Sequence, residues 1–519
     1  MKYRLGVDVG GTNTDAVILD ENRNVLASIK YPTSEDVRSG ITGAIHNAVK
    51  ASGIDPARIH QAMLGTTQCT NAIVERKHLT KIGILRIGAP ASLGIPPMTD
   101  WPSGFEDMVE EACMIRGGYE YNGKEIAPFD RNAAAAFFTR MKAAHIQSIA
   151  ISCVFATVRD DHEKEAEKLC HEIMGDDVHV TLSSQIGSMG LIERENAAIL
   201  NAALYDVAKR FTQGFLDSLQ QEGITNAKAY LSQNDGTLMD IDQARKYPIL
   251  TVACGPTNSI RGAGYLSSLT NALVLDVGGT TTDAGVIQNG FPRESGIAVT
   301  IGGIRTNFRM PDVVSIGLGG GSIVRTKDDG TVTVGPDSVG WQITTRAMVF
   351  GGSTMTATDI AVRLGMADIG KKELVKDIPE DTARKAMAVI KAKAEDAIDD
   401  MKISSDPVDV ILVGGGSIIL PQTLNGARNV IKPECFGCAN AIGAAISKVA
   451  GTCEKLMDYD KTPREQAIGI VKEEARENAI KAGADPDTVE IVEAEDVPLQ
   501  YYPGNTCRIK AKAAGDLTD

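Results

Sequence analysis

The sequence predicts an α/β protein made of two similar halves that face each other across a cleft. Three observations support this fold class. The chain has 519 residues, which exceeds the length that a single hydrophobic core usually supports, so two or more domains are expected. Strand-like apolar runs alternate with amphipathic helical stretches. Finally, the phrase "DVGGTNTDA" beginning at Asp8 returns as "DVGGTTTDA" beginning at Asp276, so each half is expected to carry one copy.

The elements divide the chain into four parts. We expect residues 1–190 to form the first half, with an insertion at about 90–145 where Pro and Gly are frequent. A long helical stretch at 191–224 is predicted to connect the halves. Residues 225–453 are assigned to the second half. The acidic remainder, 454–519, is expected to be a small α+β extension.

Composition narrows the location and the partners. The net charge of −14 argues against nucleic acid or an anionic membrane surface as the main partner. No apolar run reaches membrane-spanning length, and no signal peptide is expected at the start. The nine scattered cysteines are typical of reduced thiols. These features predict a cytoplasmic protein.

Each glycine phrase is expected to form a hairpin turn at the end of a buried strand. Paired glycines permit positive φ and close backbone approach. Successive N–H groups and threonine hydroxyls can then hold phosphate oxygens. Neither phrase is a Walker A loop or a Rossmann fingerprint. The residues predicted to bind phosphate are Gly10, Gly11, Thr12, Asn13, Thr14, Gly278, Gly279, Thr280 and Thr281.

Carboxylates bracket both turns. Asp8 and Asp276 precede the glycines, where carboxylate oxygens suit Mg²⁺ held through water. Asp15 and Asp283 close the turns, and for them a turn-stabilising role is as plausible as a chemical one. Asp8, Asp276 and Asp283 are the predicted catalytic residues.

A third glycine element occurs in "ILVGGGSIILP", a buried strand that ends at Gly414, Gly415 and Gly416. Backbone without side chains can lie against a flat nucleoside. Together with the two hairpins and two small-residue helices, this set resembles the superfamily of actin, hexokinase and heat-shock-chaperone ATPases. That resemblance implies two RNase H-like domains with ATP and Mg²⁺ in the cleft between them.

More specific stretches resemble the hydantoinase A/5-oxoprolinase family. They are "LGTTQCTNAIVERK" (64–77), "ERENAAILNAAL" (193–204), "CGPTNSIRGAGYL" (254–266) and "TATDIAVRLG" (356–365). Thr66, Thr67 and Asn71 lie where a strand gives way to a helix, a usual place for ligands, although a polar helix cap would look the same. With the family match, they and Arg194 become the predicted substrate residues.

The family resemblance implies ATP-dependent opening of a cyclic amide, such as a hydantoin or a 5-oxoproline-like lactam. The γ-phosphoryl group would activate the carbonyl oxygen, and the intermediate would then be open to water. A hydantoinase B-type subunit and a homo- or hetero-oligomer are implied partners. The chain departs from the family pattern at Val314, where a histidine is usual, and in the segment Cys254 to Ser259. These departures leave the substrate open.

Two other functions fit the same nucleotide elements. One is a small-molecule kinase, which would release a stable phosphorylated product. The other is an ATP-driven reactivating or chaperone-like protein. Cys435 and Cys438 form a lone C-x-x-C pair, which is weak evidence for a metal. Cys69 and Cys254 are conceivable nucleophiles, but buried thiols are expected more strongly.

Overall fold

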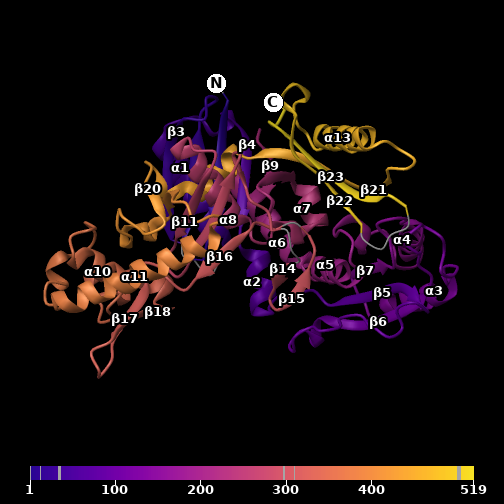
Figure 1. Ribbon diagram of the computed structural model, residues 1–519, viewed down its shortest axis with the longest axis horizontal. Coiled ribbons are helices and arrows are strands. Elements are labelled where there is room, and N and C mark those ends of the chain that lie inside the picture. Colours follow the sequence, from indigo (N-terminus) through magenta and orange to yellow (C-terminus); the bar gives the residue numbers. More distant parts are fainter. Residues whose placement is uncertain are drawn as a thin grey trace.

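The structure is a computed structural model that describes residues 2–11, 13–32, 37–295, 299–308, 310–499 and 504–518. Thr12, one of the predicted phosphate-binding residues, lies outside the described residues. The strands form two large mixed sheets, one smaller parallel sheet and two short hairpins (Figure 1). In the described part of the chain, no helix is both long enough and apolar enough to cross a membrane.

The first sheet has nine strands in the order β22-β23-β21-β10-β9-β4-β1-β2-β3. β1 pairs antiparallel with β2 and parallel with β4, which places the glycine turn at the carboxyl end of a central strand. Its strands are β1 (Tyr3–Val9), β2 (Asn13–Leu19), β3 (Val25–Pro32), β4 (Ile59–Thr66), β9 (Lys228–Ser232), β10 (Thr237–Asp240), β21 (Lys448–Asp458), β22 (Glu490–Pro498) and β23 (Thr506–Gly515).

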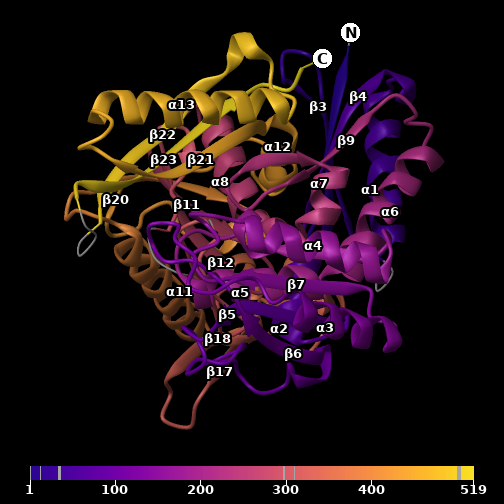
Figure 2. The ribbon, with the colours of Figure 1, turned by 90° about the vertical axis from the view of Figure 1, so that its right-hand side faces the viewer.

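Helices cover both faces of the β1–β3 region because its side chains alternate between two cores. Ala16 and Ile18 belong to the core that includes α1 (Val37–Ser52). Val17 and Leu19 pack with α12 (Ala439–Ile446) on the opposite face. α6 (Tyr205–Gln221) lies against α1. Further along the sheet, α13 (Arg464–Lys481) packs on the outer side of β21 and β23 (Figure 2).

The second sheet has the order β13-β12-β11-β19-β20, and β16 also pairs with β12. Val274 and Ile411 face α8 (Cys254–Ser267), whereas Leu275 and Leu412 face the core that contains α11 (Glu380–Met401). α10 (Ala357–Arg363) packs beside α11. The strands are β11 (Ala272–Val277), β12 (Thr282–Gln288), β13 (Phe291–Pro292), β16 (Val313–Ile316), β19 (Val408–Val413) and β20 (Ala427–Ile431).

The predicted insertion at 90–145 is part of a larger α/β unit. Four parallel strands in the order β6-β5-β7-β8 form its sheet, and they begin before residue 90 and continue past 145. The buried rings of Phe137 and Phe138 fill the core between this sheet and its helices. Its elements are β5 (Ile82–Ala89), β6 (Val109–Arg116), α3 (Arg131–Ala143), β7 (Ser148–Cys153), α4 (Asp161–Met174) and β8 (His179–Leu182).

The connection between the halves differs from the predicted helix at 191–224. That stretch forms two helices, α5 (Leu191–Ala203) and α6, which meet at Leu204. α5 packs on β7 and α6 on α1, so both belong to the first half. The helices between the two large sheets are α8 and α12. α8 packs on β11, β12 and β19, and α12 packs on β1, β2 and β4.

Sheet membership also differs from the predicted boundaries at 225 and 454. β9 pairs parallel with β4, with Tyr230 opposite Met63, so residues after 225 return to the first sheet. β21 joins β10, and β23 joins β21, so the C-terminal strands extend that same sheet. Strand pairing between distant segments therefore decides these boundaries. The other elements are α2 (Gln68–Glu75), α7 (Ile241–Lys246), α9 (Ile343–Arg346), β14 (Val299–Ile301), β15 (Ile304–Thr306), β17 (Ser322–Thr326) and β18 (Val332–Ser338).

Candidate nucleotide site

The two glycine phrases form the same turn. In the first, the backbone N–H of Gly10 donates to the Asn13 oxygen at 3.0 Å between β1 and β2. In the second, the N–H of Gly278 donates to the Thr281 oxygen at 2.9 Å between β11 and β12. The predicted hairpins at strand ends are therefore both present, one in each large sheet.

Each hairpin carries a pair of aspartates directly opposite each other. Asp8 pairs with Asp15 across β1 and β2, and Asp276 pairs with Asp283 across β11 and β12. Residues opposite each other in an antiparallel pair have side chains on the same face. Each hairpin therefore presents two carboxylates together.

Burial makes these carboxylates hold protons more strongly than exposed ones. Burial, aided by the negative charge of Asp15, raises the pKa of Asp8 to about 7. Burial likewise raises the pKa of Asp283 to about 6, against a hydrogen bond from the Ser315 hydroxyl that favours the charged form. The pKa values of Asp15 and Asp276 are also raised, again mainly by burial. A cation bound here would favour release of these protons.

Side chains from α8 and α12 join the two aspartate pairs. The Asn440 amide donates to Asp8 Oδ2 at 3.4 Å. The Ser259 hydroxyl contacts both Asn440 Oδ1 and Asp276 Oδ2. The fully buried Asn258 lies beside Asp8, and both side chains face Gly65. A Cβ added to Gly65 would lie 2.6 Å from Asn258 Nδ2 and 2.3 Å from Asp8 Oδ1. The carboxylates of the two sheets thus belong to one connected polar cluster.

Two glycines let α8 and α12 approach closely enough for these contacts. A Cβ at Gly262 in α8 would lie 2.0 Å from the Ala439 oxygen. A Cβ at Gly443 in α12 would lie 1.9 Å from the backbone carbonyl oxygen of Asn258. Real Cβ atoms do not tolerate such distances, so the helix backbones meet only because both positions are glycine.

The second turn is covered by glycine segments of its own half. The N–H groups of Gly320 and Gly321 donate to the oxygens of Gly278 and Gly279 at 3.0 and 2.7 Å. From the other side, a Cβ at Gly414 would lie 2.3 Å from Asp276 Oδ1, and one at Gly416 would lie 2.1 Å from the Gly278 oxygen. Gly414 and Gly416 therefore pack directly on the end of β11, where the sequence predicted a nucleoside surface.

The first turn is open on one side and has a lysine ammonium beside it. A Cβ at Gly11 would meet no described atom within 4 Å. Lys30, on β3 opposite Asp15, places its ammonium 2.7 and 2.8 Å from the two Asp15 oxygens. Its carbon chain reaches the second half, since a Cβ at Gly415 would lie 3.8 Å from Lys30 Cε. Lys30 thus lies between the two hairpins.

The predicted substrate residues separate into two places. Thr66 ends β4 beside Val9, and the Thr67 hydroxyl donates to the Val9 oxygen at 3.3 Å. Asn71 follows on the exposed side of α2 and contacts Thr67 Oγ1 at 3.5 Å. These three therefore lie next to the first turn.

Arg194 lies apart from them, buried in the scaffold. Its guanidinium donates to the Cys153 oxygen at 2.7 Å, to Ser183 Oγ at 3.0 Å and to the Ser188 oxygen at 3.4 Å. Only 2% of its surface is exposed. The structure therefore gives Arg194 a role in holding the segment before α5, and it does not bring this side chain to the first turn.

Comparison with known proteins gives a family. The model of the hydantoinase/oxoprolinase N-terminal region matches residues 4–174, and the hydantoinase/oxoprolinase model matches residues 194–402. The chain belongs to the hydantoinase/oxoprolinase family. The stretches that predicted this family from the sequence lie within or next to these matched regions, so that prediction is confirmed.

Individual relatives are distant in sequence. An uncharacterized protein of Methanocaldococcus jannaschii is 24% identical, over 100% of this chain and 83% of the relative. The caprolactamase subunit alpha of Pseudomonas jessenii is 25% identical over 70% of this chain, and the match spans 54% of the relative's length. A crystal structure of an ATP-dependent caprolactamase from Pseudomonas jessenii superimposes with a TM-score of 0.78 at 20% identity, covering 99% of this chain and 88% of the other. This likeness shows that the α/β fold is shared.

The cysteines of this hydantoinase/oxoprolinase chain fit the expectation of buried thiols. Cys69 and Cys254 are both fully buried, and burial raises the pKa of each thiol to about 12. Burial raises the pKa of the Cys438 thiol to about 11, while Cys435 is exposed. Among the described residues, no group of three or more His, Cys, Asp or Glu side chains is placed to hold a metal ion directly.

Four residues of the cluster were not predicted from the sequence: Lys30, Asn258, Ser259 and Asn440. Lys30 carried a usable signal. A hairpin turn centred on Glu21 to Asn24 places residue 30 opposite Asp15, as observed. Asn258 and Ser259 stood in a segment that departs from the family pattern. Nothing local pointed to Asn440, because its role depends on the packing of α12 on α8.

Proposed function

We propose that this chain opens a cyclic amide, such as a hydantoin or a 5-oxoproline-like lactam, at the expense of ATP. The observation that carries the proposal is the connected cluster of Asp8, Asn440, Ser259 and Asp276 between two nearly identical glycine turns. Carboxylates from both halves meet there, next to backbone N–H groups and a lysine. This donor set suits a nucleotide and its metal held between two facing actin-like domains.

Residues of both turns would hold the nucleotide. Because Gly11 has no side chain, the space beside its Cα is open and could receive a phosphate group. In the third glycine element, Gly415 is the exposed residue, whereas Gly414 and Gly416 are buried. We assign phosphate contacts to Gly10, Gly11, Asn13, Thr14, Gly278, Gly279, Thr280 and Thr281, and nucleoside contacts to the Gly414–Gly416 run. Thr12 is retained as a proposal from the sequence.

The donor chemistry also fits Mg²⁺. Asp8 Oδ1 is buried without a hydrogen-bond partner among the described residues, and the pKa of Asp8, about 7, allows its proton to leave near neutral pH. We assign Asp8 and Asp276 to the metal, held through water. When bound, Mg²⁺ would neutralise charge on the phosphates.

The remaining residues would place the substrate and move protons. Phosphoryl transfer to the amide oxygen depends on positioning and charge stabilisation. Thr66, Thr67 and Asn71 border the first turn and would orient the amide. Lys30 would stabilise negative charge between the hairpins. Asp283, with a pKa of about 6, can exchange a proton near neutral pH and is our candidate for general base catalysis.

A partner subunit is part of the proposal. The caprolactamase relative is named as a subunit, and this chain spans about half of that relative's length. We therefore propose that a B-type subunit completes the active assembly, as a hetero-oligomer.

The test is ADP release by the purified chain, with and without a B-type partner, over a panel of hydantoins, 5-oxoproline and simple lactams. We expect at least one cyclic amide to stimulate ATP turnover and to yield an opened ring and free phosphate. A stable phosphorylated product would instead indicate a kinase. Failure of every cyclic amide, with and without the partner, would refute the proposed substrate class.

A further inference from the structure

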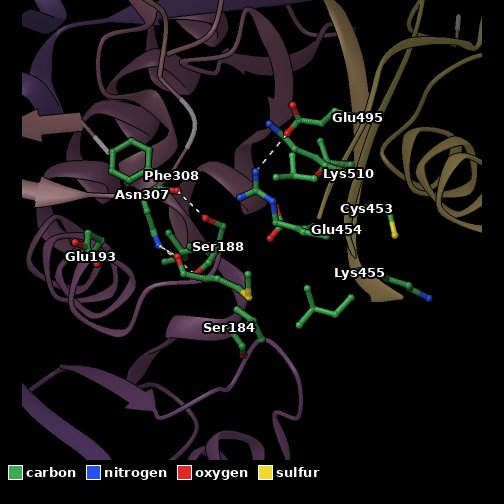
Figure 3. A pocket seen from close by; sticks show the side chains of 18 of the residues that line it. Ser184, Ser188, Glu193, Asn307, Phe308, Cys453, Glu454, Lys455, Glu495 and Lys510 are labelled. Carbon is green, nitrogen blue, oxygen red and sulfur yellow. Dashed lines mark hydrogen bonds and ion pairs between the residues drawn. The ribbon is translucent and has the colours of Figure 1, made fainter. Parts of the chain in front are cut away.

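A cleft of about 930 Å³ lies away from the aspartate cluster, between the segment that follows β8 and the C-terminal strands (Figure 3). One wall is the segment from Ser184 to Met189 with Asn307 beside it. The other is the charged face of β21, β23 and β22. Neither Asp8 nor Asp276 lines this cleft, so a ligand bound in it would not occupy the nucleotide site.

The sheet wall has cations down its middle strand. Lys510 on β23 stands opposite Glu454 on β21 and Glu495 on β22. Two residues further along, Arg508 stands opposite Leu456 and Val497. Arg508 is thus a cation flanked by two apolar side chains, and Lys510 is one flanked by two acids.

The ion pairs of Lys510 and Arg508 are longer than those of Lys512, and the side chains become more exposed from Lys512 through Lys510 to Arg508. Lys512 is 4% exposed and lies 2.9 Å from both Asp235 and Glu294. Lys510, 18% exposed, lies 3.5 Å from a Glu493 oxygen and 3.7 Å from a Glu294 oxygen. Arg508 is 29% exposed and has an ion pair of 3.5 Å with Glu495. Its Nε is buried and has no hydrogen-bond partner among the described residues, so Arg508 retains capacity for an anion.

The opposite wall offers acceptors. The Asn307 amide nitrogen donates to the Met189 oxygen at 2.8 Å and to the Ser188 oxygen at 3.1 Å. Its Oδ1 lies against Gly187, where an added Cβ would come within 2.5 Å of it. Asn307 Oδ1 and Ser184 Oγ are both buried, and the described part of the chain offers neither a partner. Buried polar atoms of native proteins are nearly always satisfied, so these call for a ligand or water.

We propose that this cleft binds an aliphatic amino acid whose ammonium and carboxylate are separated by a methylene chain. The carboxylate lies on Arg508, the methylenes lie over Leu456, and the ammonium lies beside Glu454, facing the wall from Ser184 to Met189. Opening a simple lactam releases a molecule of this class. Naming the ligand as the reaction product therefore rests on the proposed function, whereas the binding site rests on the cleft alone.

The test is calorimetric titration of the full chain, without nucleotide, using 5-aminopentanoate, pentanoate and pentylamine as probes. We expect saturable binding of 5-aminopentanoate, and binding at least about tenfold weaker for each probe that lacks one charge. Absence of saturable binding of 5-aminopentanoate overturns the proposal. Equal binding of pentanoate or pentylamine also overturns it, since one charged group would then suffice.

Variants locate the site. Arg508→Gln removes the anion receptor, and Val497→Glu adds a carboxylate beside it at a position that is already 39% exposed. Each is expected to weaken 5-aminopentanoate binding by about tenfold or more. Arg384→Gln on α11, whose side chain is 70% exposed, is the matched control and should bind normally. If either cleft variant, shown folded by circular dichroism, binds as tightly as the unmodified chain, the site is wrong.

Asp276→Asn separates this proposal from the function. It is expected to lose ATP turnover and still bind 5-aminopentanoate. If binding holds while no cyclic amide stimulates ATP turnover, the proposed function fails and the site stands. If turnover holds while binding fails, the site alone is refuted.

Discussion

The two hairpins are nearly identical in sequence and yet sit in different surroundings. The first turn is open at Gly11 and has Lys30 bound to its closing aspartate. The second turn is covered by Gly320 and Gly321 and by the Gly414–Gly416 run, and its closing aspartate, Asp283, accepts a hydrogen bond from Ser315. The repeated phrase therefore determines the turn, and distant segments determine what each turn can do.

This difference suggests a division of work. The covered turn is a fixed wall of the site because its backbone oxygens are already bonded. The open turn keeps free space and a cation, so its charge responds more to ligands and to pH. α8 and α12 hold the two turns in one cluster through Asn440 and Ser259.

The largest effect is expected from separating the two hairpins. Gly443→Ala places a Cβ 1.9 Å from the Asn258 oxygen and forces α12 away from α8. We expect a loss of about 2–3 kcal/mol in the free energy of unfolding, measured with urea, together with loss of ATP turnover. Gly469→Ala on α13, where a Cβ meets no described atom within 4 Å, is the control and should gain about 0.5–1 kcal/mol. Equal stability of the two variants would show that the close helix packing is unimportant.

Removing the charge of the open hairpin should stabilise the ligand-free protein. The pKa of Asp8 is about 7 in the folded chain, whereas that of a fully solvated aspartate is 3.8. The folded state therefore binds more protons than the unfolded state between these values, and stability falls as pH rises through them. Asp8→Asn cannot ionise, so we expect its free energy of unfolding at pH 8 to be about 1–3 kcal/mol higher, with a flatter pH dependence.

Urea unfolding at pH 5 and pH 8 measures this effect. Asp368→Asn, at a side chain that is 89% exposed, serves as the control and should keep the pH dependence of the unmodified chain. An Asp8→Asn variant that is less stable at pH 8 with an unchanged pH slope would contradict the assigned burial of this carboxylate.

Alanine at one glycine near each turn sharpens the contrast between open and covered. In Gly319→Ala the Cβ would lie 2.6 Å from the carbonyl carbon of Gly279, so we expect about 1–2 kcal/mol loss of stability. Gly11→Ala should change stability by less than about 0.5 kcal/mol and raise KM for ATP, because its methyl group enters the proposed phosphate space. Thermal unfolding and ATP kinetics measure both. A destabilised Gly11→Ala variant with normal KM would reverse the interpretation.

The smallest effect concerns the lysine. Lys30→Met removes the cation that lowers the pKa of Asp15 and Asp276. Because the Lys30 side chain is 37% exposed, we expect the acid limb of ATP turnover to move up by only about half a pH unit. Lys50→Met, on the exposed last turn of α1, should leave that limb in place. A pH profile of ATP turnover decides between them.

Local parts of the site were predictable from the sequence, and assembled parts were not. A repeated strand-glycine-glycine phrase implies a turn, so both hairpins and the aspartates that precede them could be predicted. Asn440 and Ser259 matter because two helices 181 residues apart in the chain touch through glycines. No spacing rule connects such positions.

The fold shows the same limit. Alternating strands and helices predicted the α/β class, but the strand partners of β9 and β21 lie far away in the sequence. The stretch at 191–224 differs from its predicted single helix because of packing. Its helical pattern was real, but its apolar faces pack on β7 and α1 within the first half. Arg194 shows the same ambiguity, because a motif arginine can be either a ligand contact or a buried anchor, and its substrate role stays a prediction.

The central claim is that the two hairpins form one ATP site. Its most direct test is ATP turnover by Asp8→Asn, Asp276→Asn and the double variant, each checked for folding by circular dichroism. Groups that act as a unit give non-additive losses. We predict that each single variant loses about 100-fold or more and that the double variant is scarcely worse. Near-normal turnover in either single variant would contradict the claim.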